Sequence, residues 1–268
     1  MSTLTHRRLS RHILHRLIDD APTQEISLTD DHRRSLSARF RAVTSTDHRR
    51  IDAWMVERAG QPYDAFRWSP VTARRVIGNA ALRRMVDDPT LTEFAAVDIE
   101  VTDQLLRAAS GYSRGGSLSQ WLSQSSPSVI GLVSAEAANW TTQLGEAAEG
   151  IFHPWVVASS DAYYDVARAR TTLRGRRDLI VINGLSRILL RFRAGSPGKS
   201  AGPGLRADLT IDALAEPTGR AASRVIGLWP EAGVVLSVDA SMEDLRSGAR
   251  DLVRTAVARQ RHQLINAA

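Results

Sequence analysis

The sequence predicts an α/β (α+β) protein, in which an all-helical N-terminal region, residues 1–125, precedes an α/β domain, residues 126–268, with a mixed central sheet. Three observations predict this fold. The first 125 residues show helical spacing of apolar positions and helix-stop signals. Runs rich in β-branched and aromatic residues begin only after Pro127. The dipeptide Asn183-Gly184 joins two of these runs, which is a strong signal for a β-hairpin.

The N-terminal region is predicted to be helical because apolar residues recur on one side of each segment. In the first helix Leu9, Ile13 and Leu17 lie at i, i+4 and i+8. Its opposite face is basic, and this face is either simply solvated or contacts phosphate groups or an acidic partner (Arg7, Arg8, Arg11, His12, His15 and Arg16). Ser69 as N-cap and Pro70 at the first helical position begin another helix. The predicted helices span residues 4–18, 29–43, 47–59, 69–85, 91–110 and 118–123.

In residues 126–268 the sequence predicts a helix, a three-strand meander, a second helix, two further strands and a last helix, in that order. These helices are expected over residues 129–148, 205–214 and 241–265. The extended segments are expected over residues 155–159, 163–173, 178–182, 187–192, 225–229 and 234–238. Ser241 as N-cap with Asp244 three residues later resembles a capping box at the start of the last helix.

Composition narrows the class of protein. Hydrophobic residues make up 43% and charged residues 24%, as in ordinary globular proteins. No apolar run approaches the roughly 18–20 residues that a membrane span needs. The absence of cysteine excludes disulfides, cysteine-based zinc sites and thiol nucleophiles. We therefore expect a cytoplasmic protein without a membrane partner.

The charge balance allows a polyanionic partner without deciding for one, so the positions of the arginines have to decide. The formal net charge is +6, from 35 basic and 29 acidic residues. Lys199 is the only lysine, which is typical of a GC-rich coding sequence. Codon bias explains why arginine replaces lysine, but it does not explain the surplus of basic residues. That surplus is consistent with a nucleic-acid partner.

Three short segments resemble a known family. Residues 173–181 read L-R-G-R-R-D-L-I-V, residues 191–195 read R-F-R-A-G, and residues 221–233 resemble a strand followed by a turn. Together with the order of elements, they resemble the PD-(D/E)XK (restriction-endonuclease-like) nuclease superfamily, in particular the nuclease domains of bacterial recombination helicase–nucleases. The resemblance covers about residues 129–265. It implies an αβββαβ core.

The resemblance also implies a site, and the sequence departs from it. Such nucleases hold Mg²⁺ or Mn²⁺ with two or three carboxylates, and the metal activates the attacking water. The resemblance places Asp178 at the first acid position and Glu136 at the acid of the first helix. Arg191 replaces the second strand acid, and Arg193 replaces the lysine. A guanidinium group cannot ligate a cation and repels one nearby. We therefore expect a pseudo-nuclease without a metal cofactor, in which Asp178 pairs with Arg191 or Arg193.

The same departures suit the binding of a nucleic-acid backbone, because arginine makes bidentate contacts with phosphate. The residues expected to bind nucleic acid are Arg174, Arg176, Arg177, Arg191, Arg193 and Lys199. The alternative is that Arg191 and Arg193 are neutralised by Asp178, Glu136 or Asp208 and only brace the fold.

Three functions remain open. The first is a non-catalytic protein that binds nucleic acid, with DNA favoured over RNA, in repair, recombination or defence against foreign DNA. The second is an active nuclease that uses Mg²⁺ or Mn²⁺, with Asp178 and Glu136 as catalytic and metal-binding residues and a migrated acid such as Asp165, Asp208 or Asp212. The third is a protein–protein scaffold, with a partner docked on the helical region.

Overall fold

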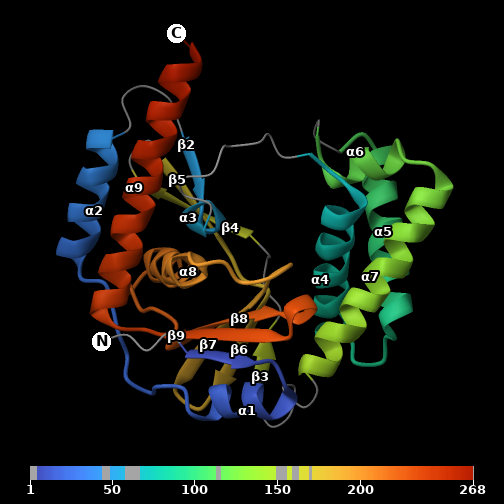
Figure 1. Ribbon diagram of the computed structural model, residues 1–268, viewed down its shortest axis with the longest axis horizontal. Coiled ribbons are helices and arrows are strands. Elements are labelled where there is room, and N and C mark those ends of the chain that lie inside the picture. Colours follow the sequence, from blue (N-terminus) through green and yellow to red (C-terminus); the bar gives the residue numbers. More distant parts are fainter. Residues whose placement is uncertain are drawn as a thin grey trace. The chain divides into compact units, whose positions relative to one another are not determined.

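The computed structural model describes residues 5–43, 49–57, 67–112, 116–148, 156–158, 163–168 and 171–267. The chain forms two compact units (Figure 1). Residues Met1–Pro62 and Ser160–Ala268 form the first, called the α/β unit below, and residues Tyr63–Ser159 form the second, called the helical unit. The predicted α/β class with a mixed sheet is confirmed. The chain does not divide after residue 125 as expected, because the helical unit is inserted between the two halves of the α/β unit.

The main sheet of the α/β unit is mixed, with strands in the order β1-β9-β8-β7-β6. β7 and β8 run parallel, whereas β6–β7, β8–β9 and β1–β9 are antiparallel pairs. The predicted hairpin at Asn183-Gly184 is present, and Gly184 adopts the positive φ of 56° that such a turn requires. These strands are β1 Thr5–Arg8, β6 Leu179–Asn183, β7 Ser186–Phe192, β8 Arg224–Trp229 and β9 Val234–Asp239.

A second, smaller sheet has the strand order β2-β5-β4. β2 (Arg49–Asp52) runs parallel to β5 (Thr171–Arg176), and β4 (Tyr163–Arg168) is antiparallel to β5. The segments expected to form one meander are therefore divided between two sheets, with β4 and β5 in this one and β6 and β7 in the main sheet.

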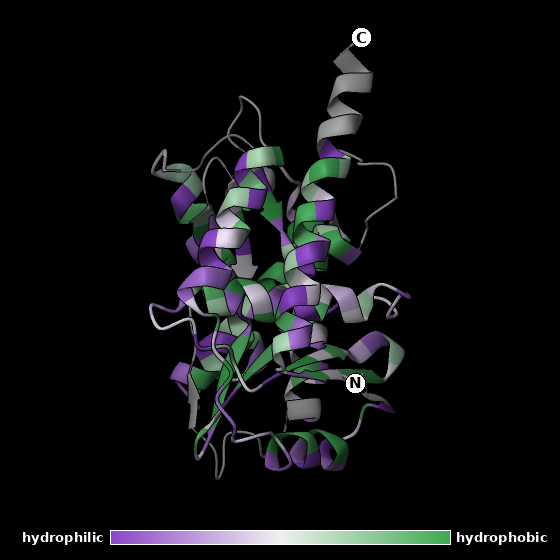
Figure 2. Ribbon diagram, turned by 90° about the vertical axis from the view of Figure 1, so that its left-hand side faces the viewer, coloured by the Kyte–Doolittle hydropathy of each residue, from purple (hydrophilic) through white to green (hydrophobic). Residues whose placement is uncertain are grey.

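Helix α8 (Ala201–Ala215) is the crossover that allows β7 and β8 to run parallel, and it lies between the two sheets (Figure 1). Twelve of its residues are buried, including Asp208 and Asp212. The other helices of this unit are α1 Arg11–Asp19, α2 Asp30–Val43, α3 Ala53–Glu57 and α9 Met242–Ala267, with a 3-10 turn, η1, at Pro230–Ala232. In Figure 2 apolar residues follow the strands, whereas α2 and α9 carry both polar and apolar residues.

The helical unit has its own apolar core. Ser69 caps α4 through a capping box, as its sequence predicts, and Pro70 is the first helical residue. The core residues come from all four helices, among them Ile77, Val97, Leu122 and Val133. The elements are α4 Pro70–Asp87, α5 Glu93–Ala109, α6 Leu118–Ser123 and α7 Pro127–Ala148, followed by β3 Val156–Ala158.

The expectation that residues 1–125 are entirely helical is wrong at two places. Residues Thr5–Arg8 form β1, and Arg49–Asp52 form β2, where helices over 4–18 and 47–59 were expected. Both strands pair with segments more than a hundred residues away, β1 with β9 and β2 with β5. Local spacing does not report such pairing, since tertiary contacts decide the conformation of short polar segments.

No helix among the described residues is both long enough and apolar enough to cross a membrane.

Candidate functional site

The pairing of β6 with β7 places Asp178 beside Arg191. Leu179 faces Leu190 across the two strands, and the backbone N–H of Asp178 donates to the carbonyl of Leu190 at 3.2 Å. Arg191 Nη1 then donates to Asp178 Oδ2 at 2.8 Å, and the backbone N–H of Phe192 donates to the same oxygen at 2.8 Å. The predicted proximity of Asp178 and Arg191 is confirmed. Both residues are buried, with 0% and 3% of their surface exposed.

Arg191 links Asp178 to a second buried acid. Its Nε donates at 2.9 Å to Oδ2 of Asp208, a residue of α8. Arg193 Nη2 donates to the same Asp208 oxygen at 2.8 Å and lies 2.7 Å from Glu57 Oε1. Arg176 Nε donates to Asp178 Oδ1 at 2.7 Å. We call this set of three guanidinium and three carboxylate groups the first ionic cluster (Arg176, Arg191, Arg193, Glu57, Asp178 and Asp208).

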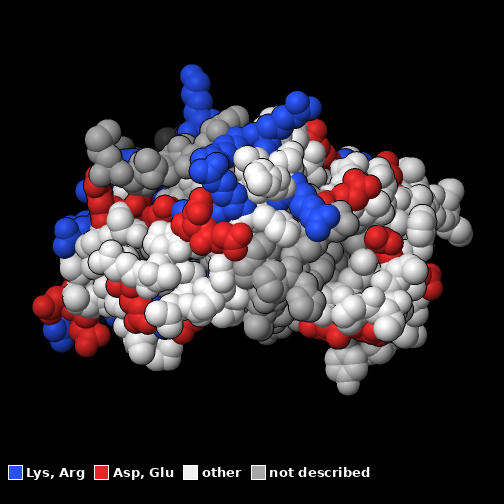
Figure 3. All heavy atoms as spheres, turned by 90° about the horizontal axis from the view of Figure 1, so that it is seen from below, with Lys and Arg blue, Asp and Glu red and all other residues white. Residues whose placement is uncertain are grey.

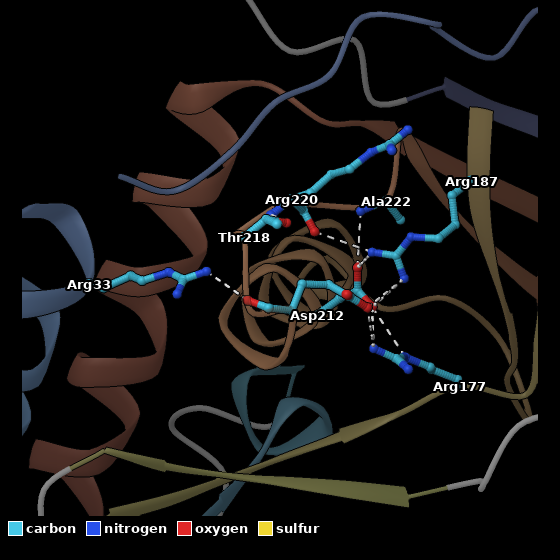
Figure 4. A network of polar contacts seen from close by, with 8 residues as sticks. Arg33, Arg177, Arg187, Asp212, Thr218, Arg220 and Ala222 are labelled. Atoms are coloured by element: carbon cyan, nitrogen blue, oxygen red, sulfur yellow. Dashed lines mark hydrogen bonds and ion pairs between the residues drawn. The ribbon is translucent and has the colours of Figure 1, made fainter. Parts of the chain in front are cut away.

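A second ionic cluster surrounds Asp212, one turn after Asp208 on α8 (Figure 4). Arg177 Nη2 donates to Asp212 Oδ1 at 2.9 Å, and Arg187 Nη2 donates to Oδ2 at 2.6 Å. The backbone N–H of Ala222 also donates to Oδ2, at 3.0 Å. Both arginines lie within 3.5 Å of Glu216 Oε1. Two guanidinium groups thus balance two carboxylates, and the carboxylate of Asp212 is fully buried.

The remaining predicted residues lie outside these clusters. Arg174 on β5 makes a bidentate pair with Asp165, at 2.7 and 2.8 Å. That hydrogen bond lowers the pKa of Asp165, and no group of acids that could hold a metal is found among the described residues. Lys199 is exposed, two residues before α8. Glu136 lies on α7 in the helical unit, where it pairs with Arg74 at 3.1 Å.

Four of the six residues expected to bind nucleic acid are largely buried and paired with acids. The side chains of Arg191, Arg193, Arg177 and Arg176 are only 4%, 10%, 17% and 21% exposed, and all four pair with acids of the same unit. A guanidinium group that is buried and paired in this way has few donors left for phosphate. The contacts support the alternative in which Arg191 and Arg193 are neutralised and brace the fold.

The donors around Asp178 do not fit a magnesium ion. Three of the four carboxylate oxygens of Asp178 and Asp208 accept hydrogen bonds from Arg176, Arg191, Arg193 or the backbone of Phe192. The fourth, Asp208 Oδ1, is buried and accepts none. The two buried aspartates thus leave one oxygen for an ion that prefers six oxygen ligands, and the guanidinium group of Arg191 lies between their carboxylates, where it would repel a cation.

Exposed basic residues occur elsewhere on the α/β unit. The segment formed by β1 and α1 carries Arg8, Arg11, His12 and Arg16 exposed, while Leu14, Leu17 and Ile18 of α1 are buried. In Figure 3, which views the molecule from the side of α1, basic side chains gather in one region and acidic ones lie next to it. The sequence predicts this basic face of α1. It leaves open whether the face is simply solvated or contacts phosphate groups or an acidic partner.

Several residues of the site were not predicted from the sequence. Glu57 belongs to the first ionic cluster, but it lies far in sequence from the segments that resemble the family. Arg187 belongs to the second, but in the sequence it is one residue of an ordinary strand pattern. Asp212 was considered only as a migrated acid, and Asp208 either as a migrated acid or as a counter-ion of Arg191 and Arg193, which it is. The spacing of these two aspartates, four residues on an apolar helix, is the signal that could have found them, because it places both carboxylates on one side of α8.

No protein-family model matches this chain, and no curated protein matches it.

Proposed function

We propose that this chain is a non-catalytic nucleic-acid-binding protein whose α/β unit is a nuclease-like core with a neutralised acidic cluster. The observation that carries the first part is the position of Arg191, buried between Asp178 and Asp208. A guanidinium group at this point replaces a divalent cation as the counter-ion of both carboxylates. It cannot activate a water molecule as a metal ion does, because a guanidinium group has no site at which water oxygen can coordinate.

Charge balance supports the second part of the proposal. Each of the two ionic clusters is neutral, so the surplus of six positive charges is carried by other residues. On the α/β unit four basic side chains, Arg8, Arg11, His12 and Arg16, are exposed within the nine-residue segment Arg8–Arg16, and Arg16 also pairs with Asp20 at 3.3 Å. Such a surface attracts a phosphate backbone without regard to sequence, and the interaction weakens as salt rises. DNA remains the favoured partner.

Binding and cleavage are tested in the same assay. Labelled single- and double-stranded DNA and RNA are titrated with the protein, with fluorescence anisotropy as the readout, over a series of salt concentrations. We expect salt-dependent binding and no cleavage when Mg²⁺ or Mn²⁺ is added. Cleavage that Asp178→Ala abolishes would overturn the proposal in favour of the nuclease.

The binding surface is tested by a charge-matched pair of variants. The test variant carries Arg8→Gln, Arg11→Gln and Arg16→Gln, and the control carries Arg34→Gln, Arg41→Gln and Arg254→Gln, which are also exposed. We expect the test variant to lower the slope of log affinity against log salt by about 0.9 for each arginine that contacts a duplex phosphate. An equal loss in both variants would show that the β1–α1 segment is not the binding surface.

A second candidate, the protein–protein scaffold, is favoured by a different observation. Among the described residues, six of the seven exposed large hydrophobic side chains lie in the helical unit, including Phe94 at 71% and Leu106 at 61% exposed. Exposed apolar side chains are frequent at sites of protein association. This candidate predicts no nucleic-acid affinity at about 150 mM salt. The same titration therefore separates the two functions.

A further inference from the structure

A groove between α2 and α9 is lined by residues that neither the proposed binding surface nor the ionic clusters use. Its volume is about 300 Å³. One wall is the face of α2 formed by His32, Ser35, Leu36 and Arg39, spaced as successive turns of a helix. The other wall is formed by α9, and Leu28 closes the groove; α9 contributes Leu245, Arg246, Ala249 and Arg250.

The groove combines a cationic rim with an apolar floor. Arg39, Arg246 and Arg250 are exposed, whereas Leu36 and Leu245 are buried. No carboxylate is among the described residues that line it. Three like charges around a concave surface with an apolar floor repel one another more strongly than they would on a flat wet surface. An anion bound in the groove would relieve that repulsion.

One arginine is already held in position by the imidazole of His32. Arg246 Nη2 lies 2.9 Å from His32 Nε2, and Thr29 Oγ1 lies 2.7 Å from His32 Nδ1. A guanidinium group only donates hydrogen bonds, so Nε2 accepts and Nδ1 carries the hydrogen that is donated to Thr29. This chain of contacts orients Arg246 at the groove before any ligand arrives, which lowers the entropy lost on binding.

We infer that this groove binds the phosphate group of a nucleotide, with the base on the apolar floor. Arginine suits both parts of such a ligand, since its planar group pairs with phosphate oxygens and stacks on flat rings. The volume is in the range of small-molecule sites. The inference does not depend on the proposed nucleic-acid function, because the nucleotide can be free or can be one unit of a nucleic-acid strand.

The test measures binding of adenosine 5′-monophosphate by calorimetry at about 50 mM salt. Adenosine, which lacks the phosphate, is the ligand control. The test variant is Arg246→Gln with Arg250→Gln. The control variant is Arg41→Gln with Arg254→Gln, which removes two charges from the same two helices outside the groove. All four side chains are exposed, so circular dichroism should show that both variants fold.

We expect the test variant to raise the Kd for adenosine 5′-monophosphate by about tenfold or more, because charge-assisted hydrogen bonds are lost. The control variant should retain the affinity, and adenosine should bind far more weakly than its phosphate. Absence of binding to the unmodified protein, or equal losses in both variants, would overturn the inference.

Competition identifies the source of the nucleotide. If a short single-stranded DNA displaces adenosine 5′-monophosphate from the unmodified protein, the groove holds a unit of a strand; if it does not, the groove holds a free nucleotide. Nucleic-acid binding without adenosine 5′-monophosphate binding would leave the proposed function intact and remove this inference. The reverse result would remove the proposed function and leave the groove.

Discussion

Replacing Arg191 by methionine tests whether the first ionic cluster holds the α/β unit together. Methionine keeps most of the length of the side chain and removes the guanidinium group. The change breaks two charge-assisted hydrogen bonds, to Asp178 and to Asp208, each worth about 1.5–3 kcal/mol. It also leaves the buried negative charges of Asp178 and Asp208 with less positive charge beside them. Both considerations lead to a loss of about 3–5 kcal/mol in the free energy of unfolding.

Hydrogen exchange read by mass spectrometry measures this loss in the unit where it arises. The opening free energy of peptides from β7 and β8 should fall by that amount, while peptides from α4 and α7 in the helical unit should be unchanged. The control is Arg174→Met, which breaks the pair with Asp165, whose side chain is 47% exposed, and it should cost no more than about 1 kcal/mol. If Arg191→Met costs no more than this control, the cluster does not carry the stability assigned to it.

Three further outcomes are expected. Gly248→Ala should destabilise the α/β unit by about 1–3 kcal/mol in urea denaturation, because a Cβ there would lie 2.5 Å from the carbonyl oxygen of Arg206 and still closer to Thr210; an unchanged midpoint would contradict the close packing of α8 and α9. Ser69→Ala should cost the helical unit about 1 kcal/mol through loss of its capping box, and Ser69→Thr should restore most of it. Burial raises the pKa of Asp52 above the ordinary value of an aspartate, so the folded protein binds a proton at Asp52 more readily than the unfolded chain does. The stability that this proton contributes is lost as the pH rises from the unfolded pKa of Asp52 through its folded pKa. Asp52→Asn should therefore stabilise the protein at pH 7 but not below about pH 4, and a gain that is constant from pH 3 to pH 7 would contradict this explanation.

The sequence predicted elements whose signals are local. The Ser69-Pro70 start of α4 and the Asn183-Gly184 hairpin depend on neighbouring residues, and both are present. The two short strands at Thr5–Arg8 and Arg49–Asp52 were missed because the strands with which they pair are distant in sequence. The domain boundary was misplaced for the same reason.

The candidate site was predicted in part. Asp178 and Arg191 come together because the register of one hairpin sets their positions, and a hairpin is a local feature. Their further partners, Asp208 and Glu57, come from α8 and α3. Whether an arginine faces solvent or a buried acid depends on such partners. The resemblance therefore led to a predicted cationic site at arginines that the structure buries in ion pairs with acids.

The interruption of the α/β unit by the helical unit sets the order in which the chain can fold as it is synthesised. Residues 63–159 are continuous, so the helices can collapse as soon as they leave the ribosome. The first 62 residues cannot: β1 has no partner until β9 emerges more than two hundred residues later. We expect the N-terminal segment to remain open to chaperones during that interval, and the α/β unit to fold slowly, in one late step.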